Sequence, residues 1–237
     1  MVLHHDEGVK STPPAQWSAS PIRPPKGDAC GVGATPGDLG PYVVHDPAGR
    51  LADVSRICIP YATTEGQTAK IAEYVADVVR EHGHEARAVD LKDAGEDVLA
   101  GCDAVILGSS IHMGKHDKHV GDLVRKHRAA LERLPSALFS VSLAAHGDTH
   151  EAETYVEEFE EETGWRPSMV ALFSGALLYT QYGFLKRHMM KRIARGKPGD
   201  LGTDTSRDYV YTEWDGVRRF AEDFLNGLAP DTGGTQQ

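Results

Sequence analysis

The sequence predicts an α/β fold: a three-layer sandwich in which helices cover both faces of a five-stranded parallel sheet. Short apolar runs alternate with amphipathic segments between residues 54 and 228. Runs such as Ala104–Leu107 ("AVIL") are continuous in apolar residues, which is typical of strands buried on both faces. Five strands in this length fit the doubly wound order 2-1-3-4-5. That order places a ligand at the carboxyl ends of the strands, between the first and the third.

The predicted elements alternate along the chain. The strands are Arg56–Tyr61, Ala86–Leu91, Ala104–Leu107, Ala137–Leu143 and Met169–Leu177. The helices are Thr68–His82, Lys118–Leu134, Glu151–Glu162, Phe184–Arg195 and Trp214–Leu225. In the first helix Ile71, Val75, Val78 and Val79 recur at helical spacing, which predicts one buried stripe. Gly83 follows as a typical helix stop.

The two ends of the chain differ from its middle. Residues 1–53 hold eight of the 13 prolines and seven glycines, and they show no sustained helical or strand period. We expect them to form a disordered extension, or to reflect a misassigned start site. The folded domain is expected to span residues 54–228, and residues 229–237 are expected to form a disordered tail.

Charge and composition exclude several classes of protein. The net charge of −10 argues against general nucleic-acid binding. No apolar stretch is long enough to span a membrane, and the first residues lack the apolar core of a signal peptide. Cys30, Cys58 and Cys102 are scattered without CxxC spacing, which predicts neither a disulfide framework nor a zinc site. A reducing cytoplasm is the simplest compartment.

The end of the first strand is rich in hydroxyl groups. In "YATTEGQT", Thr63, Thr64, Gly66 and Thr68 lie where a strand passes into a helix, with no lysine or arginine among them. A helix N-terminus presents unpaired N–H groups and a partial positive charge, so this turn predicts a phosphate held by amides and hydroxyls. It is not a Walker loop, because Gly-Lys-Ser/Thr is missing. The alternative interpretation is a plain turn with a threonine N-cap.

The ends of the third and fourth strands complete this site. Gly108–His119 ("GSSIHMGKHDKH") and Ser140–Asp148 ("SVSLAAHGD") are small or polar near the strand and then apolar. A planar ring fits between two such loops. Together with the phosphate turn, they predict a mononucleotide that carries a flat ring.

Several motifs resemble one family. "TTEGQT" resembles the phosphate loop of flavodoxins. "LPSALFSVSL" (Leu134–Leu143), "GWRP" (Gly164–Pro167), "SGALLY" (Ser174–Tyr179) and "VYTEW" (Val210–Trp214) resemble the flavodoxin-like, menaquinone-dependent protoporphyrinogen IX dehydrogenases. The similarity runs from about Arg56 to Leu228. It implies a flavodoxin-like fold, bound FMN, oxidation of protoporphyrinogen IX for haem biosynthesis, and electron delivery to a menaquinone-like quinone.

The resemblance also implies which residues bind FMN. Those expected at the phosphate are Thr63, Thr64, Glu65, Gly66, Gln67 and Thr68. Those expected beside the ring are Ser109, Ser110, Ile111, His112, Met113 and Gly114, with Ser142, Leu143, Ala144 and Ala145 opposite them. Electron-carrier flavodoxins usually stack an aromatic residue on the ring, and these two loops contain none. Either the ring face is open for a bulky substrate, or His112, His146 or Met113 takes the stacking position.

A basic segment follows the fifth strand. Gly183–Gly199 contains no acidic residue and six basic ones: Lys186, Arg187, Lys191, Arg192, Arg195 and Lys197. Phe184, Leu185, Met189 and Ile193 share one side of the same helix. The helix is a solvated face, or a site for porphyrin propionates, or a contact with anionic lipid headgroups near a quinone pool. The last interpretation places the protein in the cytoplasm, peripherally on the inner face of the cell membrane.

Two other functions remain open. The first is an electron-transfer flavodoxin without a substrate of its own, which is expected to show an acidic docking face and no basic helix. The second is a flavodoxin-like domain that has lost its flavin and acts only as a binding module. His112, His116 and His119 have helical spacing but complete no ligand set, so no metal is expected. A histidine near the flavin suits a proton acceptor, but no catalytic base is assigned.

Overall fold

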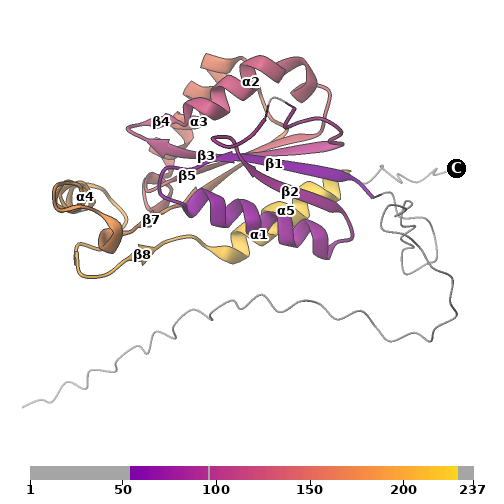
Figure 1. The fold of residues 1–237 in the computed structure, drawn as a ribbon. Coiled ribbons are helices and arrows are strands. Elements are labelled where there is room, and N and C mark those ends of the chain that lie inside the picture. Colours follow the sequence, from indigo (N-terminus) through magenta and orange to yellow (C-terminus); the bar gives the residue numbers. More distant parts are fainter. Residues whose placement is uncertain (1–53, 96, 229–237) are drawn as a thin grey trace, which may run out of the picture. The chain divides into compact units, whose positions relative to one another are not determined.

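A computed structural model of the chain describes residues 54–95 and 97–228 (Figure 1). The predictions for residues 1–53 and 229–237 lie outside these residues. Within the described part, no helix is long and apolar enough to cross a membrane.

The predicted strand order is confirmed. Five parallel strands lie in the order β2-β1-β3-β5-β6, and the short β4 pairs antiparallel with the end of β3. Their bounds are β1 Arg56–Ala62, β2 Glu85–Asp90, β3 Ala104–His112, β4 Lys115–His116, β5 Ser136–Ser142 and β6 Met169–Ser174. The prediction of one strand over Met169–Leu177 is wrong, because the chain leaves the sheet after Ser174. Beyond Gly175, β7 (Ala176–Leu177) pairs with β8 (Tyr209–Val210) in a separate two-stranded sheet.

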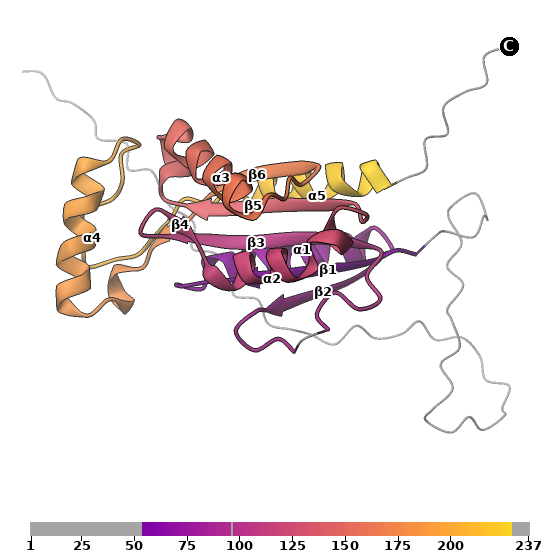
Figure 2. The same cartoon turned by 90° about the horizontal axis from the view of Figure 1, so that it is seen from above.

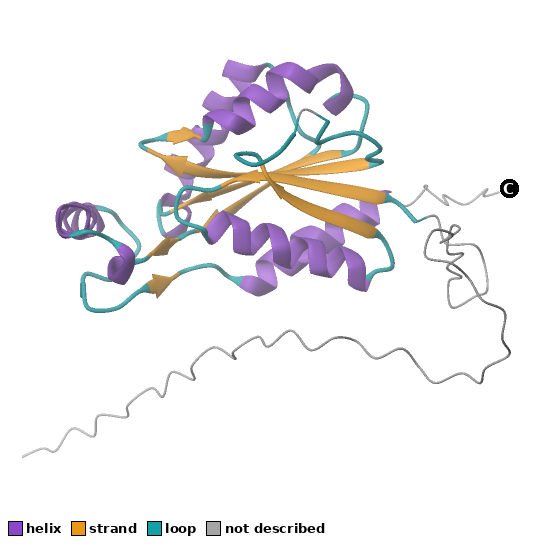
Figure 3. Ribbon diagram, viewed as in Figure 1, coloured by secondary structure: helices purple, strands orange, loops and turns teal. Residues whose placement is uncertain are grey.

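All five predicted helices are present (Figure 3). They are α1 Gln67–Glu81, α2 Lys118–Leu131, α3 Thr149–Thr163, α4 Phe184–Gly196 and α5 Trp214–Leu228. The 3₁₀ turns are η1 Ala144–His146 and η2 Tyr179–Gln181. Helix α2 ends three residues before the predicted Leu134, since Pro135 follows and the residue before a proline disfavours the helical conformation.

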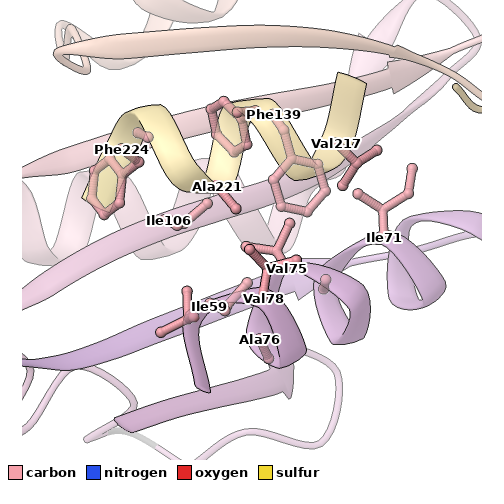
Figure 4. Close-up of a cluster of buried hydrophobic side chains, with 14 of the residues drawn as sticks. Ile59, Ile71, Val75, Ala76, Val78, Ile106, Phe139, Val217, Ala221 and Phe224 are labelled. Atoms are coloured by element: carbon pink, nitrogen blue, oxygen red, sulfur yellow. The ribbon is translucent and has the colours of Figure 1, made fainter. Parts of the chain in front are cut away.

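The helices form two layers around the sheet. Helices α1 and α5 cover one face, and α2 and α3 cover the other (Figures 1 and 2). The predicted stripe of α1 is buried, and Val75 packs with Ile106, Phe139 and Val217 (Figure 4). On the opposite face, Trp165 is fully buried among the side chains below α2 and α3. The two apolar clusters fix the sheet and therefore the position of its carboxyl edge.

One cysteine prediction is wrong. Cys58 in β1 and Cys102, just before β3, form a disulfide with their Cα atoms 5.8 Å apart. The two residues are separated by 44 positions in the chain, but β1 and β3 are neighbours, and Cys58 pairs with Val105 in the register. The sheet pairing therefore brings them together, which their spacing in the sequence does not reveal.

Helix α4 belongs to neither layer. It lies beyond the carboxyl ends of the strands (Figures 1 and 2). We call residues 176–210 the arm. The base of the arm has its own small apolar cluster, which includes Leu177, Tyr179, Tyr182 and Leu201. Among the residues of α4, only Ala194 is buried.

Candidate functional site

A cavity of about 520 Å³ lies between the carboxyl ends of β1, β3 and β5 on one side and α4 on the other. It is lined by most of the residues that the sequence predicts for an FMN site: Thr63, Thr64, Glu65, Gln67, Thr68, Ser110, Ile111, His112, Met113, Gly114, Ser142, Leu143 and Ala144. The structure thus brings the phosphate turn and the two ring loops together around one space of ordinary ligand-pocket size.

Three of the predicted residues do not line the cavity. Ser109 is buried, and its hydroxyl accepts a hydrogen bond of 3.1 Å from the Asp117 N–H, which holds the start of α2. The N–H of Ala145 donates to the Ser142 hydroxyl at 3.1 Å. Gly66 contributes backbone only. These three residues support the loops rather than forming their inner surface.

The phosphate turn leaves the start of α1 without a side-chain cap. Gly66 is the N-cap residue, with a left-handed φ of 87° that glycine adopts easily. The Thr63 hydroxyl accepts a hydrogen bond of 2.9 Å from the Gly66 N–H, which closes the turn before the helix starts. The alternative of a threonine N-cap is therefore not what the structure shows. The first N–H groups of a 15-residue helix point to a ligand site instead.

One hydroxyl in this turn lacks a partner. The Thr68 side chain is 1% exposed, lines the cavity, and has a hydroxyl oxygen with no hydrogen bond to any described residue. The neighbouring Gln67 amide donates to the Thr212 hydroxyl at 2.8 Å, which fixes its side chain. A buried polar group without a partner is costly. The Thr68 hydroxyl is thus placed to bind a ligand oxygen.

The cations around the turn come from other elements. Glu65 forms an ion pair of 2.7 Å with Lys186 of α4 and accepts a hydrogen bond from the Tyr182 hydroxyl. Burial and then this hydrogen bond raise the pKa of Tyr182, so the phenol remains a donor. Lys92 donates to the carbonyl oxygen of Thr63. The turn itself contains no cation, but two lysines approach it from outside.

The ring walls are mostly apolar. Met113 and Gly114 form the turn between β3 and β4, both with left-handed φ values of 52° and 79°, and Met113 is 91% exposed at the rim. Tyr155 of α3 also lines the cavity, an aromatic contribution that lies outside the two loops considered in the sequence. Of the proposed stacking residues, His112 and Met113 line the cavity, whereas the His146 ring packs 4.2 Å from that of Tyr211.

Eight further residues line the cavity and were not predicted for it from the sequence: Val141, Tyr155, Gly175, Ala176, Met189, Met190, Ile193 and Lys197. Four of them belong to α4 or follow it directly. Helical periodicity identified Met189 and Ile193 as part of one apolar side, but it did not indicate what that side faces. Phe184 and Leu185, assigned to the same side, are 85% and 82% exposed.

The basic residues of α4 divide between two faces. Lys186 lines the cavity. Four others line a second hollow of about 560 Å³ on the outer side of the arm: Arg187, Lys191, Arg192 and Arg195. Phe184, His188 and Thr205 line the same hollow. Arg187 also donates to the carbonyl oxygens of Tyr179 and Tyr182, at 2.9 and 3.0 Å, and thereby ties α4 to η2.

The three spaced histidines have separate environments. His112 lines the cavity, and the Nδ1 atom of His119 lies 2.8 Å from the Asp117 carboxylate. His116 is enclosed between Ser140, 3.1 Å from its Nε2 atom, and the ring of Phe159. In residues 54–95 and 97–228, no three His, Cys, Asp or Glu side chains are grouped so that they could hold a metal ion.

His116 predicts a specific pH dependence of stability. Burial lowers the pKa of His116 to about 4, whereas the unfolded chain has the ordinary value of about 6.5. Below about pH 6.5 His116 is protonated in the unfolded chain but not in the folded chain. The free energy of unfolding therefore falls as the pH is lowered from about 6.5 to about 4. Between about pH 7 and about pH 5 we expect the free energy of unfolding to fall by about 2 kcal/mol from this group.

Chemical denaturation of wild type and His116→Asn at both pH values tests this expectation. The variant is expected to be less stable at neutral pH, because it loses the contact with Phe159, but to show a shallower decline with acid. Burial also lowers the pKa of His84, which contributes equally to both proteins. An equal decline in the two proteins would show that His116 is not held neutral by the fold.

Comparisons with known proteins identify the family of the chain. Residues 58–204 match the family model of the flavodoxin domain. The solved structure of oxidised flavodoxin 1 from Bacillus cereus is 17% identical, with a TM-score of 0.46, over 74% of this chain and 100% of that one. The match to the family model, which covers more than half of the chain, shows that the chain is a flavodoxin-domain protein.

Curated relatives define the family more narrowly. Protoporphyrinogen IX dehydrogenase (quinone) from Leishmania major is 36% identical over 179 residues, which cover 73% of this chain and 77% of that protein. The protein of the same name from Escherichia coli K12 is 34% identical over 171 residues, which cover 71% and 93%. The chain belongs to the protoporphyrinogen IX dehydrogenase (quinone) family.

Proposed function

We propose that this chain is an FMN-dependent oxidoreductase that oxidises protoporphyrinogen IX to protoporphyrin IX and reduces a menaquinone-like quinone. The observation that carries the proposal is the uncapped N-terminus of α1, which opens with the Thr68 hydroxyl into an apolar cavity at the carboxyl edge of the sheet. The names of the relatives supply the substrate class. Fold alone does not specify a substrate.

The residues present fit FMN. The amides at the start of α1 and the hydroxyls of Thr64 and Thr68 suit a phosphate dianion, which is favoured at a helix N-terminus. Gly66 has open space where a side chain would otherwise stand. The loops of His112–Gly114 and Ser142–Ala144 suit the two faces of a flat ring.

The protein's own contribution is binding, orientation and exclusion of water. When bound, FMN accepts an electron pair from one substrate and passes it to another. Each oxidation step removes an electron pair and two protons from the porphyrinogen, and the quinone takes up the same number as it becomes a quinol. In this proposal His112, which lines the cavity, takes up one of these protons. The apolar side chains of α4 keep water from the ring site.

We also propose a peripheral position on the inner face of the cell membrane. Phe184 and Leu185 are strongly exposed at the start of α4, beside the outer basic hollow. Exposed apolar side chains next to several cations are typical of helices that lie on anionic bilayers. Such a position brings the cavity close to a lipid-soluble quinone.

An electron-transfer flavodoxin without a substrate is the less favoured function. A carrier needs its ring edge exposed to a protein partner, whereas here α4 lies across the cavity with a basic outer face. Anaerobic turnover of protoporphyrinogen IX tests the choice. We expect a menaquinone analogue to support continuous porphyrin formation. Flavin that is reduced readily by NADPH and flavodoxin reductase, with no porphyrin formed from porphyrinogen and quinone, would instead favour the carrier.

A further inference from the structure

Helix α4 forms the roof of the cavity but has little buried surface of its own. Met189, Met190 and Ile193 line the cavity from above, and Ala194 is the one residue of the helix that is fully covered. Elements with few buried apolar contacts are held weakly by packing. The position of the roof therefore depends on its polar contacts with the walls.

The first of these contacts joins the start of α4 to the phosphate turn. The Glu65 carboxylate pairs with Lys186 at 2.7 Å and accepts a hydrogen bond from the Tyr182 hydroxyl. The ammonium group of Lys186 also lies 4.6 Å from the centre of the Tyr182 ring. Tyr182 and Lys186 come from the arm, and Glu65 comes from the loop after β1. We call this contact the first clamp.

The second clamp joins the end of α4 to α3 and repeats the same chemistry. The Glu151 carboxylate pairs with Lys197 and accepts a hydrogen bond of 2.5 Å from the Tyr155 hydroxyl. Burial alone would raise the pKa of Glu151, but the hydrogen bonds from Lys197 and Tyr155 outweigh it and hold that pKa below its usual range. This carboxylate therefore remains charged at neutral pH.

We propose that Glu65 and Glu151 are positioning residues that hold the apolar side of α4 at a fixed height over the flavin ring site. Each takes one lysine and one tyrosine hydroxyl, and the two clamps lie at opposite ends of the helix. Lys186 and Lys197 both line the cavity, so the clamps bound the space that a second planar ligand enters. The inference rests on the proposed function, because that ligand is the porphyrinogen.

The two clamps differ in their expected effect on FMN. Glu65 lies in the turn proposed to hold the FMN phosphate, whereas Glu151 lies in α3, outside that turn. We expect the clamps to affect substrate binding, because α4 orients the porphyrinogen poorly when its distance from the ring site is not fixed. A KM effect that is measured at saturating FMN, and that also occurs in Glu151→Gln alone, thus separates positioning of the substrate from FMN binding.

The test compares Glu65→Gln/Glu151→Gln with the control Glu73→Gln/Glu153→Gln, which removes the same charge from exposed positions of α1 and α3. In the clamp variant we expect amide hydrogen exchange in residues 184–196 to rise about tenfold, and the KM for protoporphyrinogen IX, measured at saturating FMN, to rise about tenfold. The control is expected to match wild type. Glu151→Lys/Lys197→Glu exchanges the two charges of the second ion pair. In this variant we expect amide hydrogen exchange at the end of α4 to be as slow as in wild type.

The outcomes are distinct. Unchanged exchange in α4 overturns the inference, and faster exchange with an unchanged KM shows that the clamps are structural only. If wild type does not oxidise porphyrinogen, this result contradicts the proposed function but not the inference about the clamps. The KM of the quinone analogue with another reductant then replaces that of porphyrinogen, and an unchanged value in the clamp variant again overturns the inference.

Discussion

Reversing two charges on the outer face of α4 is expected to abolish membrane binding and leave FMN in place. In Lys191→Glu/Arg192→Glu the local charge falls by about four units, and each basic residue near an anionic bilayer contributes about 1 kcal/mol. We therefore expect the partition onto vesicles that contain phosphatidylglycerol to fall by about 10³-fold. FMN content is expected to be unchanged, because these two residues line the outer hollow and not the cavity.

Co-sedimentation with vesicles measures this change, and phosphatidylcholine vesicles serve as the neutral reference. Lys118→Glu/Arg133→Glu is the matched control, since it makes the same charge change at exposed positions near the two ends of α2. The control is expected to lose far less binding. Equal losses in the two variants would mean that net charge, and not α4, governs the contact. Wild-type binding by the α4 variant would make this helix a solvated face.

Removing two hydroxyls from the phosphate turn is expected to weaken FMN binding strongly. Thr64→Ala/Thr68→Ala deletes both side-chain donors that we assign to the phosphate, and a hydrogen bond to a charged group contributes about 1.5–3 kcal/mol. The expected loss is about 3–6 kcal/mol, or 10²–10⁴-fold in Kd. The folded structure is expected to persist, because Thr68 has no hydrogen-bond partner among the described residues and Thr64 shares a long hydrogen bond of 3.4 Å with the Ser110 hydroxyl.

Fluorescence titration of the apoprotein with FMN measures the affinity. Thr154→Ala/Thr203→Ala is the control, because it removes two threonine hydroxyls from positions that do not line the cavity. Riboflavin, which has the ring but no phosphate, is expected to bind wild type and the Thr64/Thr68 variant with similar affinity. An unchanged Kd for FMN in that variant would place the phosphate elsewhere.

The sheet could be predicted from the sequence because its strands are local apolar runs. Ala104–Leu107 must be buried on both faces, and few arrangements other than the centre of a parallel sheet bury such a run. The phosphate turn could be predicted for a similar reason, since the strand, the turn and the helix start are contiguous in the chain. Both predictions depend on neighbours in the sequence.

The roof of the cavity could not be predicted in this way. Tyr182 and Glu65 are 117 residues apart, and nothing local to either residue indicates the hydrogen bond between them. Helical spacing assigned Met189 and Phe184 to one side of α4, but Met189 lines the cavity and Phe184 is exposed. The Cys58–Cys102 disulfide was missed for the same reason, because its two residues meet only through the pairing of β1 with β3.

A single-turnover experiment without oxygen tests whether this chain oxidises protoporphyrinogen IX. The purified protein with its bound flavin is mixed with protoporphyrinogen IX, and flavin absorbance and porphyrin fluorescence are followed together. We predict that the flavin absorbance bleaches as porphyrin fluorescence rises, and that a menaquinone analogue added afterwards restores the flavin colour. A flavin that stays oxidised in the presence of porphyrinogen, while a general chemical reductant bleaches it normally, would contradict the claim that this chain oxidises protoporphyrinogen IX.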